Sequence, residues 1–386
     1  MSVFLGLLSI LYVFLIGALF YGWKRIAQFS IKDLPAKTGF SIIIPYRNEA
    51  GNLPQLFNSL LKLKYPVSLF EILLVNDASR DASREICTTF KQKNPQLRIS
   101  LLENFRVTGS PKKDAISTAI QNAAFDYIIT TDADCEVPEL WLQGFNEKIE
   151  KTGAELIAGP VMFSPYVFPA KNLRQEKGMK YFKAFQEMDL LSLQVAGAGG
   201  FGIGKAFMCN GANLCYNRGA FLKVGGFLGN GEISSGDDVF LLQKFVQHKL
   251  KTDFLKSREA IVLTKPEPDL SALISQRIRW AAKTPAYKSW FAKTTGLAVL
   301  LMNFSLIVGC VLAFLEIVDY EPILIAFLFK FVSDLLLLYA AAKFFKRKEV
   351  LRHYFWSSLV YPFFSTGVAI LSIFKKYEWK GRTFKR

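Results

Sequence analysis

Four long apolar stretches constrain this chain more than any other feature. They are roughly Val3–Tyr21, Gly296–Val318, Pro322–Ala342 and Tyr354–Phe374. A helix needs ~20 apolar residues to cross a bilayer, so each stretch is long enough to span one. Much of the 51% hydrophobic content lies in these stretches, and the segment between the first two is mixed and polar. We therefore expect an N-terminal transmembrane anchor at 1–25, a soluble domain at 38–290 with an interfacial helix near 270–290, a membrane region of about three helices at 296–376, and a basic tail at 377–386.

The basic residues predict how the chain sits in the membrane. Lys24 and Arg25 follow the first apolar stretch and nothing basic precedes it, which favours a retained anchor over a cleaved signal peptide. The loop at 343–352 is basic, whereas the loop at 316–321 is acidic. The positive-inside tendency then places 26–290 in the cytosol, and the membrane is expected to be the inner or plasma membrane of a bacterium.

The last apolar stretch conflicts with this charge rule. If it spans fully, the basic tail at 377–386 lies outside. Pro362 and Gly367 interrupt the stretch, and non-helical backbone within a membrane is tolerated where protein covers it. We expect a re-entrant or interfacial hairpin with an inner tail.

Charge and composition exclude several classes of function. The net charge of +16 is explained by basic inner loops that meet anionic lipid. A nucleic-acid partner is not expected, because the soluble part has no basic stripe interleaved with aromatic residues. The five cysteines have no CxxC spacing and are expected to be reduced. Only His248 and His353 occur, so catalysis must rest on carboxylates.

Short β-branched runs alternate with helical patterns in the first part of the soluble domain. Strands are expected at 40–45, 70–75, 98–102 and 127–130, and helices at 49–62, 81–91 and 110–124. This alternation predicts an α/β domain with a mostly parallel sheet covered on both faces. Ligands bind beyond the carboxyl ends of such strands. The residues at those ends are Pro45, Asn48, Glu49, Asp77 and Asp132.

Two carboxylates two residues apart, Asp132 and Asp134, follow the fourth expected strand. Hard divalent cations take one or two carboxylates together with substrate phosphates, so this pair is a candidate site for Mg²⁺ or Mn²⁺. An isolated pair of this kind is otherwise a solvated turn. Its place directly after a strand favours the metal site.

Other polar residues at the same edge have two interpretations each. Asp77 either caps a loop or accepts a hydrogen bond from the imide nitrogen of a uracil base. Glu49, Lys112 and Lys113 are either surface charges or contacts for a nucleotide. Each lies where a nucleotide would rest.

A second group of motifs lies later in the domain. Asp237 and Asp238 are expected at the N-terminus of a helix, where the helix dipole favours carboxylates. As a catalytic group, one of them would take a proton from an acceptor hydroxyl. In the run Gln276–Trp280, the side chains of Gln276, Arg279 and Trp280 share one helical face. Arg on that face would pair with a diphosphate and Trp would stack on a sugar, unless the helix is merely an amphipathic interface helix.

Two further features have open interpretations. The glycine-rich run Gly197–Gly204 lacks the pattern of a phosphate-binding loop and is expected to be a mobile loop or a close-packed turn near the membrane face. Lys330 and Asp334 lie one helical turn apart in an apolar stretch, where charges are costly. They either neutralise each other and pack helices, or contact a lipid-linked or growing glycan.

The order of these motifs resembles that of membrane-associated inverting glycosyltransferases of family 2, which include cellulose, chitin and hyaluronan synthases and many lipid-directed transferases. Three aspartate sites followed by Q(Q/R)xRW match across roughly Ser41–Trp280, and so do IIIPYRNEAGNL and GANLCYNRGAFLKVGGF. The resemblance implies a GT-A fold with a Rossmann-like sheet. It also implies a nucleotide diphosphate sugar donor, expected to be a UDP-sugar, a lipid, lipid-linked or glycan acceptor, and Mg²⁺ or Mn²⁺.

The resemblance also implies roles for the residues. Asp77 and Glu49 would contact the uridine, and Asp132 and Asp134 would hold the nucleotide and the metal. Gln276, Arg279 and Trp280 would close over the diphosphate and the acceptor.

The general base would be Asp238, matching the second acid of the family's usual Glu–Asp pair. Asp237 stands where Glu is commoner, which leaves open which of the two carboxylates is the base.

Two rival functions remain from the sequence. One is a processive polysaccharide synthase, with or without partner subunits; the small number of spans favours limited transfer. The other is a catalytically silent membrane scaffold or a subunit of a secretion complex, against which the intact acidic sites argue.

Overall fold

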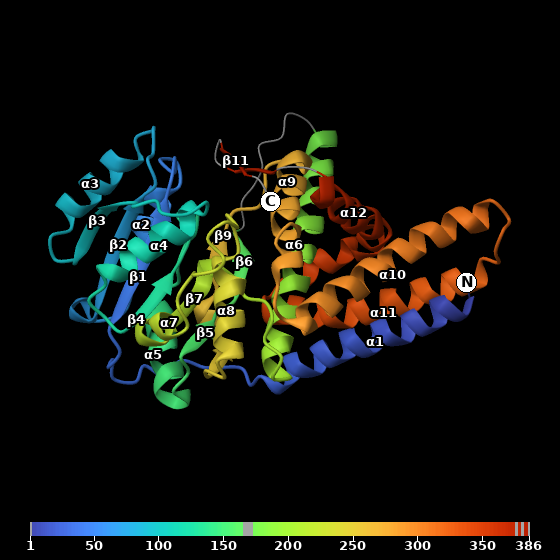
Figure 1. Ribbon diagram of the computed structural model, residues 1–386, viewed down its shortest axis with the longest axis horizontal. Helices are drawn as coiled ribbons and strands as arrows, with labels where there is room; N and C mark the ends of the chain where they lie inside the picture. The colour runs from blue at the N-terminus through green and yellow to red at the C-terminus, as the bar shows by residue number, and fades with distance from the viewer. Residues whose placement is uncertain (1, 165–172, 375–376, 380–381, 385–386) are drawn as a thin grey trace.

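The computed structural model describes residues 2–164, 173–374, 377–379 and 382–384. An α/β layer forms one half of the molecule, and long helices form the other (Figure 1). Helices α6 (Leu173–Gly202) and α9 (Leu270–Ala281) stand between the two halves. The mixed α/β class with membrane helices is therefore confirmed.

A seven-stranded sheet forms the core of the α/β half. Its order is β3-β2-β1-β4-β7-β5-β8. Strands β3, β2, β1 and β4 are mutually parallel, whereas β7 runs antiparallel to both of its neighbours. The strands are β1 (Phe40–Tyr46), β2 (Phe70–Asn76), β3 (Ile99–Glu103), β4 (Tyr127–Thr130), β5 (Leu156–Ala158), β7 (Leu214–Asn217) and β8 (Thr252–Phe254). The four strands expected from the sequence are all present.

Both faces of this sheet are buried. Along β1, Ile42 and Ile44 enter the hydrophobic core on one face and Ile43 enters the core on the other. The helices of the α/β half are α2 (Leu53–Leu60), α3 (Ser83–Lys93), α4 (Pro111–Gln121), α5 (Trp141–Thr152), α7 (Arg218–Lys223) and α8 (Asp237–Gln247). Helix α2 begins later than expected, because the Glu49 carbonyl accepts hydrogen bonds from the N–H groups of Asn52 and Leu53 and forms a turn. A two-stranded sheet of β6 (Val161–Phe163) and β9 (Val262–Thr264) lies apart from the main sheet.

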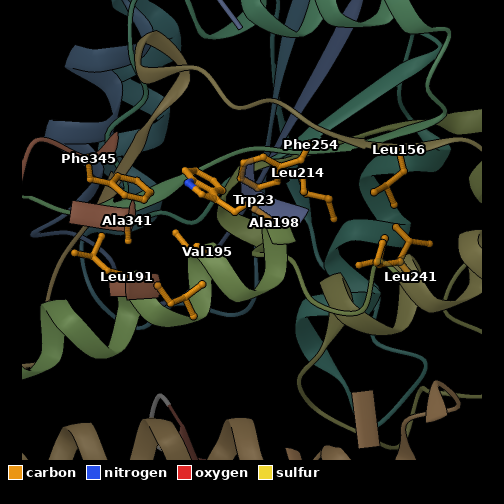
Figure 2. Close-up of a cluster of buried hydrophobic side chains, with 14 of the residues drawn as sticks. Trp23, Leu156, Leu191, Val195, Ala198, Leu214, Leu241, Phe254, Ala341 and Phe345 are labelled. Atoms are coloured by element: carbon orange, nitrogen blue, oxygen red, sulfur yellow. The ribbon is translucent and has the colours of Figure 1, made fainter. Parts of the chain in front are cut away.

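Four of the described helices are long and apolar enough to cross a membrane. They are α1 (Ser2–Arg25), α10 (Trp290–Phe314), α11 (Glu321–Phe344) and the segment that contains α12 (Tyr354–Phe374). One hydrophobic core continues from the sheet into these helices. Figure 2 shows Trp23 of α1, Val195 of α6, Phe254 of β8 and Ala341 of α11 within it. The α/β half is therefore packed onto the helices rather than tethered to them.

Residues 197–202 of the glycine-rich run are helical and only Ile203 and Gly204 form a turn, so the expectation of a loop or turn is wrong for most of the run. The helical part forms the C-terminal end of α6 and lies against the end of α1. A Cβ on Gly199 would meet the Leu19 carbonyl oxygen at 2.2 Å, and one on Gly202 would meet that of Gly22 at 1.9 Å. The glycines let two backbones touch where the membrane helices meet the α/β half.

The last apolar stretch forms one continuous helix, so the expected hairpin is also wrong. Pro362 lies inside α12. A proline can bend a helix without reversing the direction of the chain. The Tyr354 hydroxyl donates to the carbonyl of Phe331, midway along α11, at 2.7 Å. Further along α12, Val368 packs on Ile278 of α9.

After α12 the chain returns to the α/β side. Strand β10 (Tyr377–Trp379) lies beside α9 and pairs with β11 (Arg382–Phe384). The remaining tail residues, 380–381 and 385–386, lie outside the described part of the chain. An inner tail stays a prediction, with which this placement agrees.

Candidate active site

A single cavity of about 930 Å³ lies at the carboxyl ends of the parallel strands and continues between the membrane helices. Most of the site residues expected from the sequence line it. They are Pro45, Glu49, Asp77, Lys112, Asp132, Asp134, Asp237, Asp238, Gln276, Arg279 and Trp280. Side chains separated by more than 200 residues in the chain therefore meet around one space.

Two of the expected binding residues do not line this cavity. The Asn48 side chain accepts the N–H of Arg80 at 2.8 Å, and its own backbone N–H donates to Ser79. The Lys113 ammonium donates to the carbonyls of Asn230 and Ile233, each at 2.8 Å. Burial lowers the pKa of Lys113 to about 8. Both residues hold loops in place, so the structure gives no support to a substrate contact for either.

At one end of the cavity, Asp77 follows directly after β2. Its Oδ1 accepts from the Arg106 guanidinium at 2.6 Å and from the Asn104 amide at 2.8 Å. Arg47 donates to the backbone carbonyls of Asp77 and Ala78 at 2.7 and 2.9 Å. The carboxylate is thus held in a fixed orientation. Sequence reasoning did not single out Arg47 or Arg106.

In the middle of the cavity, Lys112 connects two acidic motifs. Its ammonium lies 2.7 Å from Asp132 and 3.2 Å from Asp237. Burial lowers the pKa of Lys112, but the charges of Asp132 and Asp237 outweigh it and raise that pKa above its ordinary value. Lys112 therefore stays charged and joins the first turn of α4 to the first turn of α8.

Asp238 lies at the N-terminus of α8, next to this bridge. Its carboxylate accepts the N–H groups of Gly211 at 3.1 Å and of Val239 at 2.6 Å, and it lies 3.6 Å from the Lys283 ammonium. Burial alone would raise the pKa of Asp238, but Lys283 and Lys112 lower it below its usual value. Asp238 is therefore held as a carboxylate.

Glycine allows the two adjacent carboxylates to sit this close to the backbone. A Cβ on Gly211 would meet Oδ2 of Asp237 at 2.8 Å. Gly236, which precedes α8, has a φ of 81°, in the left-handed region that favours glycine.

Helix α9 contributes side chains to the wall of the cavity. Its Gln276 side chain donates to Glu267, while Arg279 and Trp280 line the space. Arg277 does not belong to the helical face that Gln276 shares with Arg279 and Trp280. It is buried, and its guanidinium pairs with Asp189 of α6 at 2.6 Å. Its guanidinium also lies 4.1 Å from the centre of the Trp280 ring. Arg277 and Lys283 were not predicted from the sequence. The position of Lys283, three residues after Trp280, is the feature that could have pointed to a place in the site.

The two carboxylates of Asp132 and Asp134 fit a divalent cation only in part. Within the described residues, no three His, Cys, Asp or Glu side chains gather into a metal-binding group. Mg²⁺ ordinarily takes one or two carboxylates and completes its shell with phosphates and water. Two carboxylates facing one cavity therefore suit a metal that arrives with a diphosphate.

Comparisons with known proteins show the family to which this fold and this arrangement belong. The model of glycosyl transferase family 2 matches residues 41–209, and that of glycosyl transferase family group 2 matches residues 127–369. The second match covers more than half of the chain. The chain belongs to glycosyl transferase family group 2.

Curated relatives share part of the chain. Glycosyltransferase AglE of Haloferax volcanii is 29% identical over 124 residues, which are 32% of this chain and 40% of AglE. Poly-beta-1,6-N-acetyl-D-glucosamine synthase of Staphylococcus aureus is 25% identical over 130 residues, which are 32% of this chain and 30% of the synthase. The chain thus matches less than half of each relative's length.

A solved structure resembles the chain over almost its full length. It is the mannosyltransferase PcManGT from Pyrobaculum calidifontis in complex with GDP-Man and Mn²⁺. The match covers 96% of this chain and 99% of that chain, with 15% identity and a TM-score of 0.52. At this identity the likeness concerns the fold, and it supports the GT-A assignment.

Proposed function

We propose that this protein is a membrane-bound inverting glycosyltransferase. It would move a sugar from a nucleotide diphosphate donor to a lipid, lipid-linked or glycan acceptor. One observation carries the proposal: the same cavity contains Asp77, Asp132 and Asp238 and continues between membrane helices. Donor, base and a membrane-embedded acceptor would therefore meet in one space.

The chemistry follows from the charges around the cavity. Asp238, held as a carboxylate, would take the proton from the attacking hydroxyl as its oxygen forms a bond to the anomeric carbon. The bond from that carbon to the diphosphate breaks in the same step, and the electron pair leaves with the diphosphate. A single displacement inverts the anomeric centre.

Cationic side chains would stabilise the leaving diphosphate. Arg279 lines the cavity, and Lys112 lies between the two acidic motifs. Fixed charges aimed at a developing negative charge lower the barrier most where water is excluded. Mg²⁺ or Mn²⁺, bound by Asp132 and Asp134, would supply further charge neutralisation.

We propose that Asp77 recognises the nucleobase of the nucleotide-sugar donor. A carboxylate accepts hydrogen bonds from the imide N–H of uracil, and equally from the N–H groups of guanine. PcManGT was solved with GDP-Man, so both bases belong in the test. Purified protein would be screened against UDP- and GDP-sugars with Mg²⁺ and with Mn²⁺. Absence of turnover or binding with every donor would contradict the proposal, and donor hydrolysis would exclude the silent scaffold.

We further propose that the α/β half faces the cytosol. Arg258 donates to the carbonyls of Lys343 and Phe344, so the basic C-terminal end of α11 lies on the α/β side. The end of α1 with Lys24 and Arg25 lies there too, since α6 packs on it. Both basic helix ends therefore lie on the α/β side, and the positive-inside tendency favours the cytosol for that side. Reporter fusions at residues 25 and 347 would show the sidedness.

A processive polysaccharide synthase is the second candidate. The extension of the cavity between membrane helices favours it, because a growing chain would need such a path. The length of products made from a labelled nucleotide sugar separates the two candidates.

A further inference from the structure

The membrane end of the cavity contains charged groups that catalysis does not use. Lys330 and Asp334 of α11 form an ion pair of 2.5 Å, and the Tyr12 hydroxyl of α1 donates to Asp334 at 2.7 Å. All three line the cavity, although Lys330 is only 3% exposed. We propose that this cluster binds the neutral saccharide head group of a glycolipid acceptor. The inference rests on the proposed function and names its acceptor class.

A polar path connects this cluster with the catalytic end. The Lys330 ammonium lies 5.4 Å from the ring centre of Tyr361 on α12. Tyr361 lies within electrostatic reach of Asp189 of α6, which pairs with Arg277 of α9. Each of these residues lines the same cavity. Polar groups from five helices therefore extend from the run Gln276–Trp280 to Tyr12.

Helix packing alone does not explain this arrangement. The Tyr12–Asp334 hydrogen bond joins α1 to α11, but the ion pair of Lys330 and Asp334 lies within one helix and joins no two helices. Charges at membrane depth are costly and usually serve a polar pathway or a ligand. Thr295 of α10 adds an independent sign: it lines the cavity at 8% exposure, and its hydroxyl has no hydrogen-bond partner among the described residues. A ligand with hydroxyl groups would supply one.

The balance of charges around the cluster favours an uncharged ligand. Lys330 is paired with Asp334, and Arg277 with Asp189, so these four side chains carry no net charge. A phosphate placed among them would meet two carboxylates as well as two cations. Sugar hydroxyls donate and accept hydrogen bonds, and aromatic rings pack on their apolar faces. Hydroxyl groups of α12 also line the cavity, at Ser357, Ser358, Tyr361, Ser365 and Ser372.

Photolabelling of the full chain tests the ligand class directly. The chain would be placed in phosphatidylcholine nanodiscs and labelled with an alkyl maltoside that carries a diazirine in its alkyl chain. We expect crosslinks to peptides of α11 and α12, and competition by dodecyl maltoside but not by dodecyl phosphate. Equal or better competition by dodecyl phosphate, or crosslinks confined to other helices, would overturn the proposal.

Variants separate binding from structure. Tyr12→Phe and Asp334→Asn should each weaken labelling about tenfold, the effect of losing one charge-assisted hydrogen bond. Ser333→Ala is the matched control, because Ser333 lies between the paired residues, is buried and does not line the cavity. Should a single variant fail to fold, the double variant K330M/D334L removes both charges together and leaves none unpaired. Undiminished labelling of this folded double variant would also overturn the proposal.

Donor hydrolysis keeps the two proposals apart. Hydrolysis of the nucleotide sugar, with water as acceptor, needs the catalytic end and not the cluster. We expect the Tyr12→Phe variant to retain hydrolysis at the wild-type rate. Hydrolysis without maltoside labelling would refute the acceptor site alone. Labelling without turnover of any donor would refute the proposed reaction while leaving a glycolipid site.

Discussion

The ammonium of Lys283 lies 3.6 Å from the carboxylate of Asp238, and both side chains line the active-site cavity. The two come from different elements: Asp238 begins α8, and Lys283 follows α9. A buried carboxylate without a partner would tend to take up a proton. Lys283 therefore keeps the proposed base in its working form and links it to the helix that carries Arg279 and Trp280.

The first prediction concerns pH. Replacement of Lys283 by Met removes a charge that lowers the pKa of Asp238, so that pKa should rise. The base works as a carboxylate, and activity is lost as the pH falls through its pKa. The acid limb of the kcat/KM profile should therefore move to higher pH in Lys283→Met and stay near wild type in Lys283→Arg. An acid limb that does not move in Lys283→Met would argue against this pairing.

The second prediction identifies the base. Asp238→Asn should reduce transfer by at least about 100-fold, the lower range of general acid–base catalysis. Donor binding should stay largely intact, because the nucleotide end of the cavity is unchanged; calorimetric titration with the nucleotide checks this. Asp237→Asn instead removes one partner of Lys112. If Asp237→Asn abolished transfer and Asp238→Asn did not, the roles of the two acids would be reversed.

The third prediction concerns the metal. EDTA should abolish transfer, and Mg²⁺ or Mn²⁺ should restore it, because Asp132 and Asp134 offer the oxygen ligands that these cations prefer. Asp134→Asn should raise the metal concentration needed for half-maximal activity. Glu139→Gln is a suitable control, since Glu139 pairs with Lys64 on the surface. Full activity in EDTA would show that the cationic side chains of the protein neutralise the leaving diphosphate without a metal.

The strands and the acidic sites could be predicted because local sequence determines them. Runs such as Phe40–Pro45, half of which is isoleucine, are buried on both faces, and the polar residues that follow them fall at one edge of a parallel sheet. The pairing of Arg277 could not be predicted. Its partner Asp189 on α6 is 88 residues away, and only the tertiary fold brings the two side chains together.

The two wrong expectations have related causes. Gly197–Gly204 suggested a loop because glycine is a poor helix former, yet contact with α1 outweighs that preference. Pro362 and Gly367 suggested a reversal, yet α12 is continuous and packs against neighbouring helices. In both segments the tertiary surroundings override a local signal.

The contact between α1 and α6 gives the last prediction. Valine at Gly202 would place its Cβ 1.9 Å from the Gly22 carbonyl oxygen, and backbone cannot yield as a side chain does. We expect a loss of at least about 3 kcal/mol, the upper range for overpacking, seen as a lower Tm in detergent. Gly17→Ala on the facing helix α1 is the control, because a Cβ there meets nothing within 4 Å. Since this contact lies beside the shared core of Trp23 and Phe254, Gly202→Val should also loosen the α/β half from the membrane helices, and limited proteolysis between residues 25 and 40 should become faster. A Gly202→Val variant with the Tm and protease resistance of Gly17→Ala would show that the two helices do not touch here.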